Sequence, residues 1–409
     1  MGEWKNVTLD EIADFQNGKA LSPQRYTSDG TNPVFGSNGQ IAKTHDVLKD
    51  HPIISIGRVG AYCGATYYIP TKSWVTDNAI ITTPKKNTDI RFLYYLLATL
   101  NLRQTAIGSA QPLMTQGGLK VIKTCVPHLP EQKRIAYILS TLDDKIELNR
   151  RMNATLEGMA QALFKSWFVD FDPVRAKLDG HAPTALDPAT AALFPSSFQD
   201  SVLGLIPVGW EVSKLKDLTL KIGSGATPRG GSEVYVDEGP ALIRSQNVYD
   251  HEFHWAGLAR LADKSAAELK NVDVMRHDVL LNITGDSILR TCVVDPAVLP
   301  ARVNQHVAII RAIKGIPPRY LHLYLVQDSM KSFLMGMSAG ATRHAITKGL
   351  LESIDVLKPS VSVLAAFEQF TAPLFAQIDA NRTQSRTLAS LRDTLLPKLL
   401  SGELTINGN

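Results

Sequence analysis

The residues best able to do chemistry in this sequence are basic and polar side chains in loops that also contain glycine. In the first half of the chain the candidates are Lys19, Arg25, Asn38, Arg58, Tyr67 and Gln111. In the second half they are Arg229, Arg244, Gln246, Asn247, Arg290, Arg343 and His344. Arginine pairs with guanine, asparagine and glutamine pair with adenine, and glycine lets the backbone approach a phosphate. These loop residues are therefore candidates for contact with double-stranded DNA, although each cluster alone also fits an ordinary polar surface.

Motifs for catalysis are missing from the sequence. It contains no phosphate-binding loop of the form GxxxxGK[ST], no GxGxxG that opens a helix after a strand, and neither GxSxG nor HExxH. Asp170 and Asp172 could hold a metal, but they stand just before Pro173, where a helix must stop, and this favours a capping or solvated role. The histidines share no metal-ligand spacing. We expect no catalytic residue, metal or cofactor in this chain.

The composition is that of a globular protein with room for two or three domains. The chain has 409 residues, 44% of them hydrophobic and 20% charged, and its net charge of +4 permits an anionic partner without requiring one. Three widely spaced cysteines argue against disulfides and against a zinc site. The sequence begins without an apolar leader, and no apolar run approaches about 18 residues, so we expect a cytoplasmic protein without a membrane span.

Two long helices would position these loops. Residues 130–168 and 363–400 carry apolar residues at alternating steps of three and four, which is typical of a coiled-coil seam. The seam residues are Ile135, Ile138, Leu142, Met152, Leu156, Met159 and Leu163, and then Phe367, Phe370, Leu374, Leu388, Leu391 and Leu395. We predict an antiparallel pair centred on Asn149 and Asn381, whose burial would fix the register at some cost in stability. The alternative is that each helix packs only on its own domain.

The order of motifs repeats along the chain. Trp4, a Gly-rich loop, a strand-like run near residue 53 and a helix near residue 90 recur as Trp210, a second Gly-rich loop, a run near residue 279 and a helix near residue 319. The second half carries its main insertion between its Gly-rich loop and His277. Short β-rich runs alternate with a few helices in each half. We predict an α+β fold with an internal pseudo-repeat, in which two similar domains are separated by two long antiparallel helices.

Several stretches resemble a known family. LPEQKRIA at 129–136, LDDKIELN at 142–149 and LFKSWFVDFDPV at 163–174 resemble the central conserved region of the DNA-specificity subunits of type I restriction–modification systems. IPVGW at 206–210 is similar to the start of their second target-recognition domain, and LPKLLSGEL at 396–404 to their C-terminal end. The repeat order matches as well, so the resemblance covers the whole chain. The second conserved region departs from the pattern, with SVSVL at 360–364 where PEQxxI is common.

The resemblance implies five segments. Residues 1–128 would form the first target-recognition domain, 129–173 the central conserved long helix, 174–208 a connector, 209–360 the second target-recognition domain, and 361–409 the C-terminal helix and tail. The two domains would each read one half of a bipartite, asymmetric DNA sequence.

The resemblance also implies partners that supply all of the catalysis. Two modification subunits, with the S-adenosylmethionine site and the methyltransferase chemistry, would dock on the long helices. Restriction subunits, also two in number, would add cleavage that depends on ATP and Mg. Candidates for partner docking or helix register are Gln132, Arg134, Asn149, Asn153, Phe168 and Asn381.

Two other interpretations of the sequence stay open. The chain could be a fused methyltransferase or nuclease, but it lacks a nucleotide-binding βα unit and an Asn/Asp-Pro-Pro-Tyr-type pocket. It could also be an assembly adaptor that binds only protein, with the repeat as an inheritance. A sequence-dependent gel shift with the modification partner separates the adaptor from a DNA-reading subunit.

Overall fold

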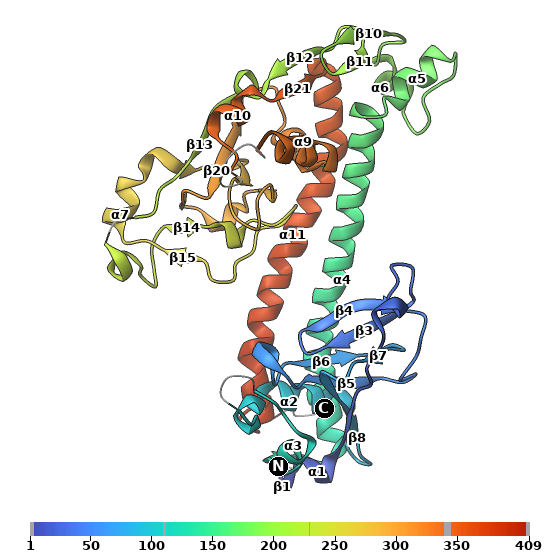
Figure 1. Cartoon of the computed structure of the whole chain (residues 1–409), viewed down its shortest axis with the longest axis vertical. Coiled ribbons are helices and arrows are strands. Elements are labelled where there is room, and N and C mark those ends of the chain that lie inside the picture. Colours follow the sequence, from blue (N-terminus) through green and yellow to red (C-terminus); the bar gives the residue numbers. More distant parts are fainter. Residues whose placement is uncertain (1–3, 109–111, 229, 339–344, 406–409) are drawn as a thin grey trace. The chain divides into compact units, whose positions relative to one another are not determined.

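A computed structural model describes residues 4–108, 112–228, 230–338 and 345–405. The chain forms two compact units, the first from residues 1–150 and 382–409, and the second from residues 151–381. Both long helices contribute to both units, because α4 (Leu129–Phe168) and α11 (Val361–Leu400) each run through the division (Figure 1). The paired helices and the mixture of helix and sheet confirm the predicted fold class. The finer boundaries at residues 128, 173, 208 and 360 stay predictions.

The first unit is built on a four-stranded antiparallel sheet. Its strand order is β2 (Ala13–Asn17), β8 (Ala79–Pro84), β5 (Ile53–Gly57) and β6 (Thr66–Ile69). A three-stranded sheet has the order β4 (Gly39–Thr44), β3 (Asn32–Gly36) and β7 (Trp74–Val75), and β1 (Lys5–Thr8) pairs with β9 (Lys123–Val126). Every residue of β5 is buried, which explains why its sequence IISIG does not alternate with polar residues.

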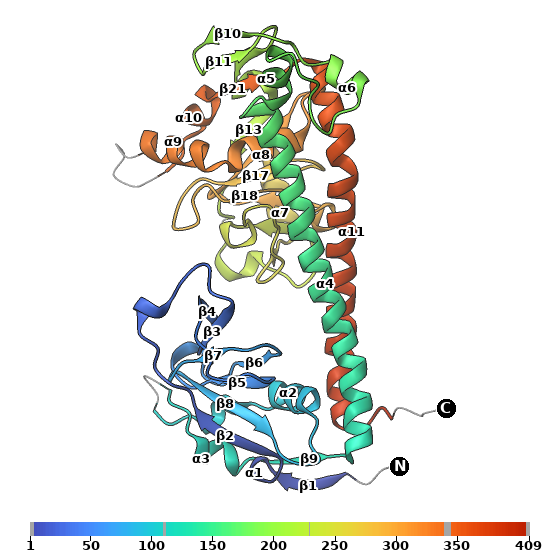
Figure 2. The same ribbon diagram turned by 90° about the vertical axis from the view of Figure 1, so that its right-hand side faces the viewer.

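Helix α2 (Ile90–Thr99) lies between this sheet and the first half of α4 (Figure 2). Its N-terminus is capped by the Asp89 carboxylate, which accepts hydrogen bonds from the amides of Arg91 and Phe92, both at 3.0 Å. Two short helices, α1 (Leu9–Ile12) and α3 (Gln116–Lys120), pack together at the other side of the unit. The core of the first unit therefore joins strand, α2 and long-helix residues in one cluster.

The two long helices are joined in the first unit by a polar network as well as by apolar contacts. Arg392 of α11 donates to the carboxylate of Asp143 of α4 at 2.7 Å, and the Tyr95 hydroxyl of α2 donates to the same carboxylate at 2.6 Å. Burial and the neighbouring Asp143 carboxylate raise the pKa of Tyr95, so its phenol keeps the proton that makes this bond. Leu399, near the end of α11, is buried in the same core.

The second unit repeats this plan with one more strand in its second sheet. One has the order β13 (Thr219–Ser224), β20 (Val307–Ala312), β17 (Val279–Asn282) and β18 (Thr291–Val293). The other has the order β15 (Ala259–Arg260), β14 (Ala241–Ile243), β19 (Ala301–Val303) and β16 (Asp273–Val274). Strand β12 (Glu211–Lys214) pairs with β21 (Asp355–Lys358). The sequential and spatial order of β13, β17, β18 and β20 matches that of β2, β5, β6 and β8, which confirms the predicted internal repeat.

The segment that holds the predicted insertion in the second half supplies β14, β15 and β16, which are three of the four strands of the sheet β15-β14-β19-β16. It contains the short 3-10 helix η5 (Gly231–Val234) and the helix α7 (Asp263–Glu268), and it encloses a separate apolar cluster that includes Leu242, Leu269 and Val298. The corresponding cluster of the first unit is smaller and centres on Ile53, Val75 and Ile81. Helices α8 (Pro318–Val326), α9 (Asp328–Ser338) and α10 (Lys348–Ser353) follow the sheets.

Aromatic side chains fasten the second unit to its halves of the long helices. Phe168 of α4 packs against Phe367 of α11 and Tyr320 of α8, with ring centroids 5.0 Å apart in both cases. Beyond α4, Pro173 opens a new helix, α5 (Asp172–Leu178), instead of simply ending the old one. After α5 come α6 (Pro188–Ala192) and a hairpin of β10 (Phe198–Ser201) and β11 (Gly204–Pro207). The connector packs on α4, since Phe194 is buried 4.9 Å from Trp167.

The helices are antiparallel, but their register differs from the prediction by about one turn. In the first unit Asn149 donates to Gln384 at 2.9 Å and to Ser385 at 3.2 Å. In the second unit Asn381 donates to Asn153 at 2.8 Å. The predicted register, centred on Asn149 and Asn381, is therefore wrong by three to four residues, about one helical turn. The predicted burial of both asparagines is confirmed.

Several predicted seam residues do not face the helix pair. Met152, Met159 and Leu391 are exposed, whereas Leu139, Ala160 and Trp167 are buried in their place. Phe370 is 41% exposed, but its ring packs on Trp167 of α4 with centroids 5.8 Å apart. The reason is that α4 and α11 each pack on a domain as well as on one another, so the buried face is wider than the two-position seam of an isolated coiled coil.

Helix α11 also bears on the expected absence of a membrane span. By length and composition alone it is apolar enough to cross a membrane, although no uninterrupted apolar run in the sequence approaches about 18 residues. Its core residues Leu364, Phe367 and Ile378 are buried against the second unit. Packing of this kind is what a core helix shared with globular domains requires.

Candidate nucleic-acid interface

In the first unit, three loops meet at one end of the two sheets. The Ser37 hydroxyl, in the turn between β3 and β4, donates to the carbonyl oxygen of Asn78 at 2.5 Å and accepts from the amide of Val59 at 3.2 Å. The amide of Arg58 donates to the same Asn78 carbonyl at 3.0 Å. Gly57 permits this approach, because a Cβ at this position would lie only 2.4 Å from the backbone carbonyl oxygen of Ser37. The result is a joined loop cluster that carries Asn38 and Arg58.

Tyr67 completes this cluster from strand β6. Its ring lies below the turn, where a Cβ on Gly39 would come within 3.1 Å of it, and its centroid is 6.1 Å from that of Phe35. Gly39 has a φ of +96°, which glycine adopts without strain. Burial raises the pKa of Tyr67, so its phenol is a neutral donor and acceptor. Asn38, Arg58 and Tyr67 thus come together as candidates for base contact.

The remaining candidates of the first unit lie apart from this cluster. Lys19 is exposed, and its backbone is held by Val75 and by the Trp74 indole, whose Nε1 donates to the Lys19 carbonyl at 2.7 Å. Arg25 forms an ion pair with Asp46, so its charge is partly balanced. Gln111 lies outside the described residues.

In the second unit, the loop after β14 holds Arg244 and Gln246 side by side. Both side chains donate to the carbonyl oxygen of Gly257, Arg244 at 2.6 Å and Gln246 at 3.1 Å. Asn247 was predicted as a DNA contact, and here the structure corrects the prediction. Its side chain is fully buried and donates to the carbonyl of His254 at 2.9 Å, so it shapes the loop from inside.

A stack of three side chains stands beside this loop. The guanidinium of Arg290 lies 4.4 Å above the ring of Tyr249, and Tyr249 stacks on His254 with centroids 3.7 Å apart and a 14° interplanar angle. The bridge between Val248 and Phe253 turns the chain so that Tyr249 and His254 face each other. The stack orients Arg290, a predicted candidate, through a cation–π contact. The roles of Tyr249 and His254 were missed, because nothing in their spacing links them to Arg290.

Three further candidates of the second half, Arg229, Arg343 and His344, lie outside the described residues. Across the described part of the chain, no group of three or more His, Cys, Asp or Glu side chains could hold a metal ion. The loop clusters therefore offer hydrogen bonds, positive charge and stacking, which are the contacts that read and hold nucleic acid.

The candidates for partner docking divide into exposed and buried residues. Arg134 is exposed on α4 and pairs with Glu131 at 3.2 Å. Gln132 is buried: it accepts from the amide of Asp89 at 3.0 Å and donates to the carbonyl of Pro127 at 2.9 Å. Phe168 is buried in the aromatic cluster described above. Gln132 and Phe168 belong to the chain's own core, which leaves helix register as the role that their burial supports.

Comparisons with known proteins agree with this architecture. The family described as "Type I restriction modification DNA specificity domain" matches residues 1–158. The HindI specificity subunit of Haemophilus influenzae is 29% identical over 385 residues, covering 83% of this chain and 81% of that protein. The MjaIX specificity subunit of Methanocaldococcus jannaschii is 26% identical over 337 residues, covering 79% of this chain and 71% of that protein.

A solved structure shares the fold over the whole chain. The crystal structure of a type I restriction–modification S subunit from M. genitalium superposes with a TM-score of 0.61 at 16% identity, covering 100% of this chain and 97% of that one. The fold is therefore that of a restriction–modification specificity subunit. The sequence matches show that the chain is similar to the DNA-specificity subunits of type I restriction–modification systems.

Proposed function

We propose that this chain selects the DNA sequence for a type I restriction–modification complex by reading two separate blocks of duplex. The observation that carries the proposal is that each unit holds its own cluster of polar loops on its own pair of sheets. Asn38 and Arg58 stand in the first cluster, and Arg244 and Arg290 in the second. Because the residues and the loop supports differ, the two blocks differ and the complete site is not palindromic.

The long helices explain why the two blocks keep a constant gap. α4 and α11 are each continuous through the division between the units, so a change of gap requires a change in helix length or packing. B-DNA completes a turn in about 10–10.5 base pairs, and the bases between the blocks are spanned without being read.

The outer faces of the same helices support docking of modification subunits. Tyr137, Leu148 and Leu391 are exposed in the first unit, and Met159 is exposed in the second. Exposed aromatic and apolar side chains of this kind are typical of protein interfaces. In this proposal the modification subunits bring S-adenosylmethionine and the methyltransferase chemistry, and restriction subunits bring cleavage driven by ATP and Mg. The chain itself has no catalytic role.

A domain exchange tests the proposal. Residues 1–127 are replaced by the equivalent module of a relative, the variant is expressed with its modification subunits, and methylated sites are mapped across the genome. One block of the motif should change while the other block and the gap stay the same. Insertion of one helical turn into both α4 and α11 should change only the gap.

Two results would contradict this function. A palindromic or continuous motif, or an exchange that alters both blocks, would remove the two-module mechanism. If methylation requires the chain but the methylated sequence stays the same whichever module is supplied, the chain is an assembly adaptor that binds only protein. The purified chain alone should transfer no methyl group and hydrolyse no ATP, and the modification subunits added back serve as the control.

A further inference from the structure

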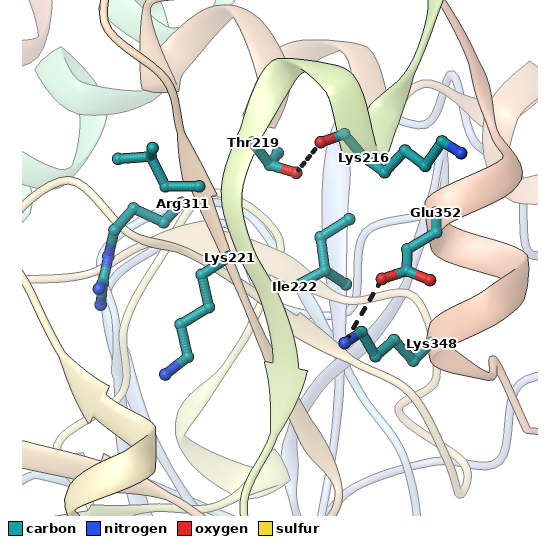
Figure 3. A pocket seen from close by; sticks show the side chains of 8 residues that line it. Lys216, Thr219, Lys221, Ile222, Arg311, Lys348 and Glu352 are labelled. Atoms are coloured by element: carbon teal, nitrogen blue, oxygen red, sulfur yellow. Dashed lines mark hydrogen bonds and ion pairs between the residues drawn. The ribbon is translucent and has the colours of Figure 1, made fainter.

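A basic pocket lies on the edge strand of the main sheet in the second unit, away from every residue that the sequence had marked as a candidate (Figure 3). It has a volume of about 510 Å³ and is open to solvent. Its walls come from the 3-10 helix η4 (Leu215–Leu218) and from β13, β20 and α10. The lining residues are Lys216, Thr219, Leu220, Lys221, Ile222, Arg311, Lys348 and Glu352.

The pocket has an excess of positive charge that the protein does not balance. Arg311 does not contribute to this excess, because its guanidinium forms two hydrogen bonds, of 2.7 and 2.8 Å, with the buried Asp278 carboxylate. The other lining residues include three lysines and one carboxylate, that of Glu352. Glu352 lies 3.4 Å from Lys348. Lys216 and Lys221 therefore leave two positive charges in excess at the pocket.

The lysines come from three elements whose positions are fixed by the fold. Helix α10 packs on both η4 and β13, so Lys348 is brought to the same surface as Lys216 and Lys221. The Thr219 hydroxyl donates to the carbonyl of Leu215 at 2.9 Å and holds the bend between η4 and β13. Lys221 donates to the carbonyl of Asn271, which leaves its ammonium with further hydrogens to donate.

The composition of the pocket decides what kind of anion it fits. No aromatic ring lines it, so it offers no surface on which a base could stack. Lysine is a compact point charge that suits a phosphate and carries no base-reading geometry. We infer that this pocket holds a phosphate of the DNA backbone and anchors the second unit on the duplex without reading sequence. The inference rests on the proposed function, because it supplies a backbone contact for the same DNA.

Charge removal in the pocket tests the inference. The double variant Lys216→Ala/Lys221→Ala is assembled with its modification subunits, and its affinity for a duplex bearing the methylated motif and for a scrambled duplex is measured over a range of salt concentrations. Both affinities should fall by roughly tenfold, since a charge-assisted hydrogen bond contributes about one such factor. The slope of log affinity against log salt should fall by about 1 in magnitude, and the motif should not change.

Two further variants complete the test: one should raise the DNA affinity, and the other is a control that should leave it unchanged. Glu352→Gln removes the only carboxylate of the lining and should raise both affinities a few-fold. Lys214→Ala removes one positive charge from the adjacent strand β12, where Lys214 already pairs with Asp355 at 2.7 Å, and should leave the affinities and the salt slope unchanged. Thermal melting of each variant checks that the fold is kept.

The outcomes separate this inference from the proposed function. If the double variant binds both duplexes as the parent does, or if Lys214→Ala has the same effect, the pocket is not a phosphate site, although sequence-specific binding stands. A loss of subunit assembly with unchanged DNA affinity would make the pocket a protein contact and would also overturn the inference. If the parent complex shows no preference for the motif, the proposed function itself fails.

Discussion

Each unit has a corner where a short helix that directly follows a strand packs on a later short helix, and the charges at matching positions are exchanged between the units. The corner is formed by α1 and α3 in the first unit and by η4 and α10 in the second. In the first unit Asp10 of α1 pairs with Lys120 of α3 at 3.1 Å. At the matching positions of the repeat the second unit has Lys216 in η4 and Glu352 in α10. The helices begin alike, because Thr115 caps α3 and Thr347 caps α10 through the same side-chain hydrogen bond, at 3.1 Å in both. The backbone frame is thus kept while the charge on it is reversed.

The two corners also differ in balance. Around Asp10 in the first unit, Lys85 lies 3.8 Å from Asp10 and 3.5 Å from Asp14, so two lysines meet two carboxylates. The second unit has a lysine excess in the same place. The shared backbone fold depends on helix caps, strand pairing and buried side chains. None of these depends on whether an exposed side chain is positively or negatively charged. The difference teaches that similar modules can keep one fold and still present unlike surfaces to a partner.

The largest expected effect comes from the ion pair that only the second corner contains. Arg311→Leu removes the partner of the buried Asp278, whereas the matching strand of the first unit has Thr83 there. A buried carboxylate without its partner costs about 3–5 kcal/mol of unfolding free energy. Denaturant unfolding of the variant measures the loss. The matched surface change Lys214→Ala should cost less than about 1 kcal/mol, and an equal loss in both variants would contradict the buried-pair explanation.

A smaller effect is expected at a glycine that both units keep. A Cβ on Gly18 would lie 2.1 Å from the Thr76 carbonyl oxygen, and one on Gly225 would lie 1.7 Å from that of Val303. Gly18→Ala and Gly225→Ala should each destabilise the protein by about 1–3 kcal/mol, because the backbone must move to make room. Gly223→Ala is the control, since a Cβ there meets nothing within 4 Å. A loss at Gly223 as large as at Gly225 would show that the close approach is not the cause.

The buried asparagines provide a test in the opposite direction. Asn149→Leu and Asn381→Leu each remove a polar side chain that bonds to the facing helix, at Ser385 and Asn153 respectively. Each should raise the melting temperature by about 2–4 °C, as expected for roughly 1 kcal/mol, while loosening the helix register. Calorimetry gives the melting temperature, and hydrogen exchange of the helix amides reports the register. An unchanged or lower melting temperature in both variants would contradict a destabilising polar layer.

The smallest effect is expected at the exposed corner of the first unit. The hydrogen bond from Lys120 lowers the pKa of Asp10 below its ordinary value. The contact therefore stabilises the protein above the ordinary Asp pKa, and this contribution is lost as the pH falls through the lowered pKa. NMR titration of the Asp10 carboxyl should show the low pKa, and Lys120→Ala should raise it towards the ordinary value. An identical titration curve in the variant would remove Lys120 as the cause.

The features of the fold that could be predicted from the sequence are those that repeat along the chain or that depend on neighbouring residues. The order of strands and helices follows from the paired motifs that begin at Trp4 and Trp210. The helix α4 begins one residue before the predicted Pro130, which fits the first helical turn, and it ends at the predicted Phe168. Pro173 lies in the first turn of α5 and does not itself end α4. The antiparallel pairing could be predicted from the two polar breaks, but the register could not. A shift of one helical turn presents the same face of a helix, so periodicity alone does not distinguish the two alignments.

The candidate site was harder to predict because its parts are brought together by the fold. Asn247 has the residue type of a base-reading side chain, yet its amide group forms hydrogen bonds with the backbone of its own loop, at Arg244 and His254. Gln132 and Phe168 stand in the motifs that carry the family resemblance, yet they are core residues. The basic pocket needs α10 beside η4 and β13, although α10 lies more than a hundred positions further along the sequence. Residue type and spacing do not reveal burial or long-range neighbours.

The division of both long helices has a consequence for how the protein is made. The second unit is one unbroken segment, residues 151–381, whereas the first needs residues from both ends of the chain, including Leu399 and Leu400 in its core. During synthesis the ribosome releases every residue of the second unit before the last core residues of the first. The core of the first unit therefore cannot be completed before the whole second unit has been synthesised. A stop codon late in the gene would spare the second unit and leave the first exposed to proteases.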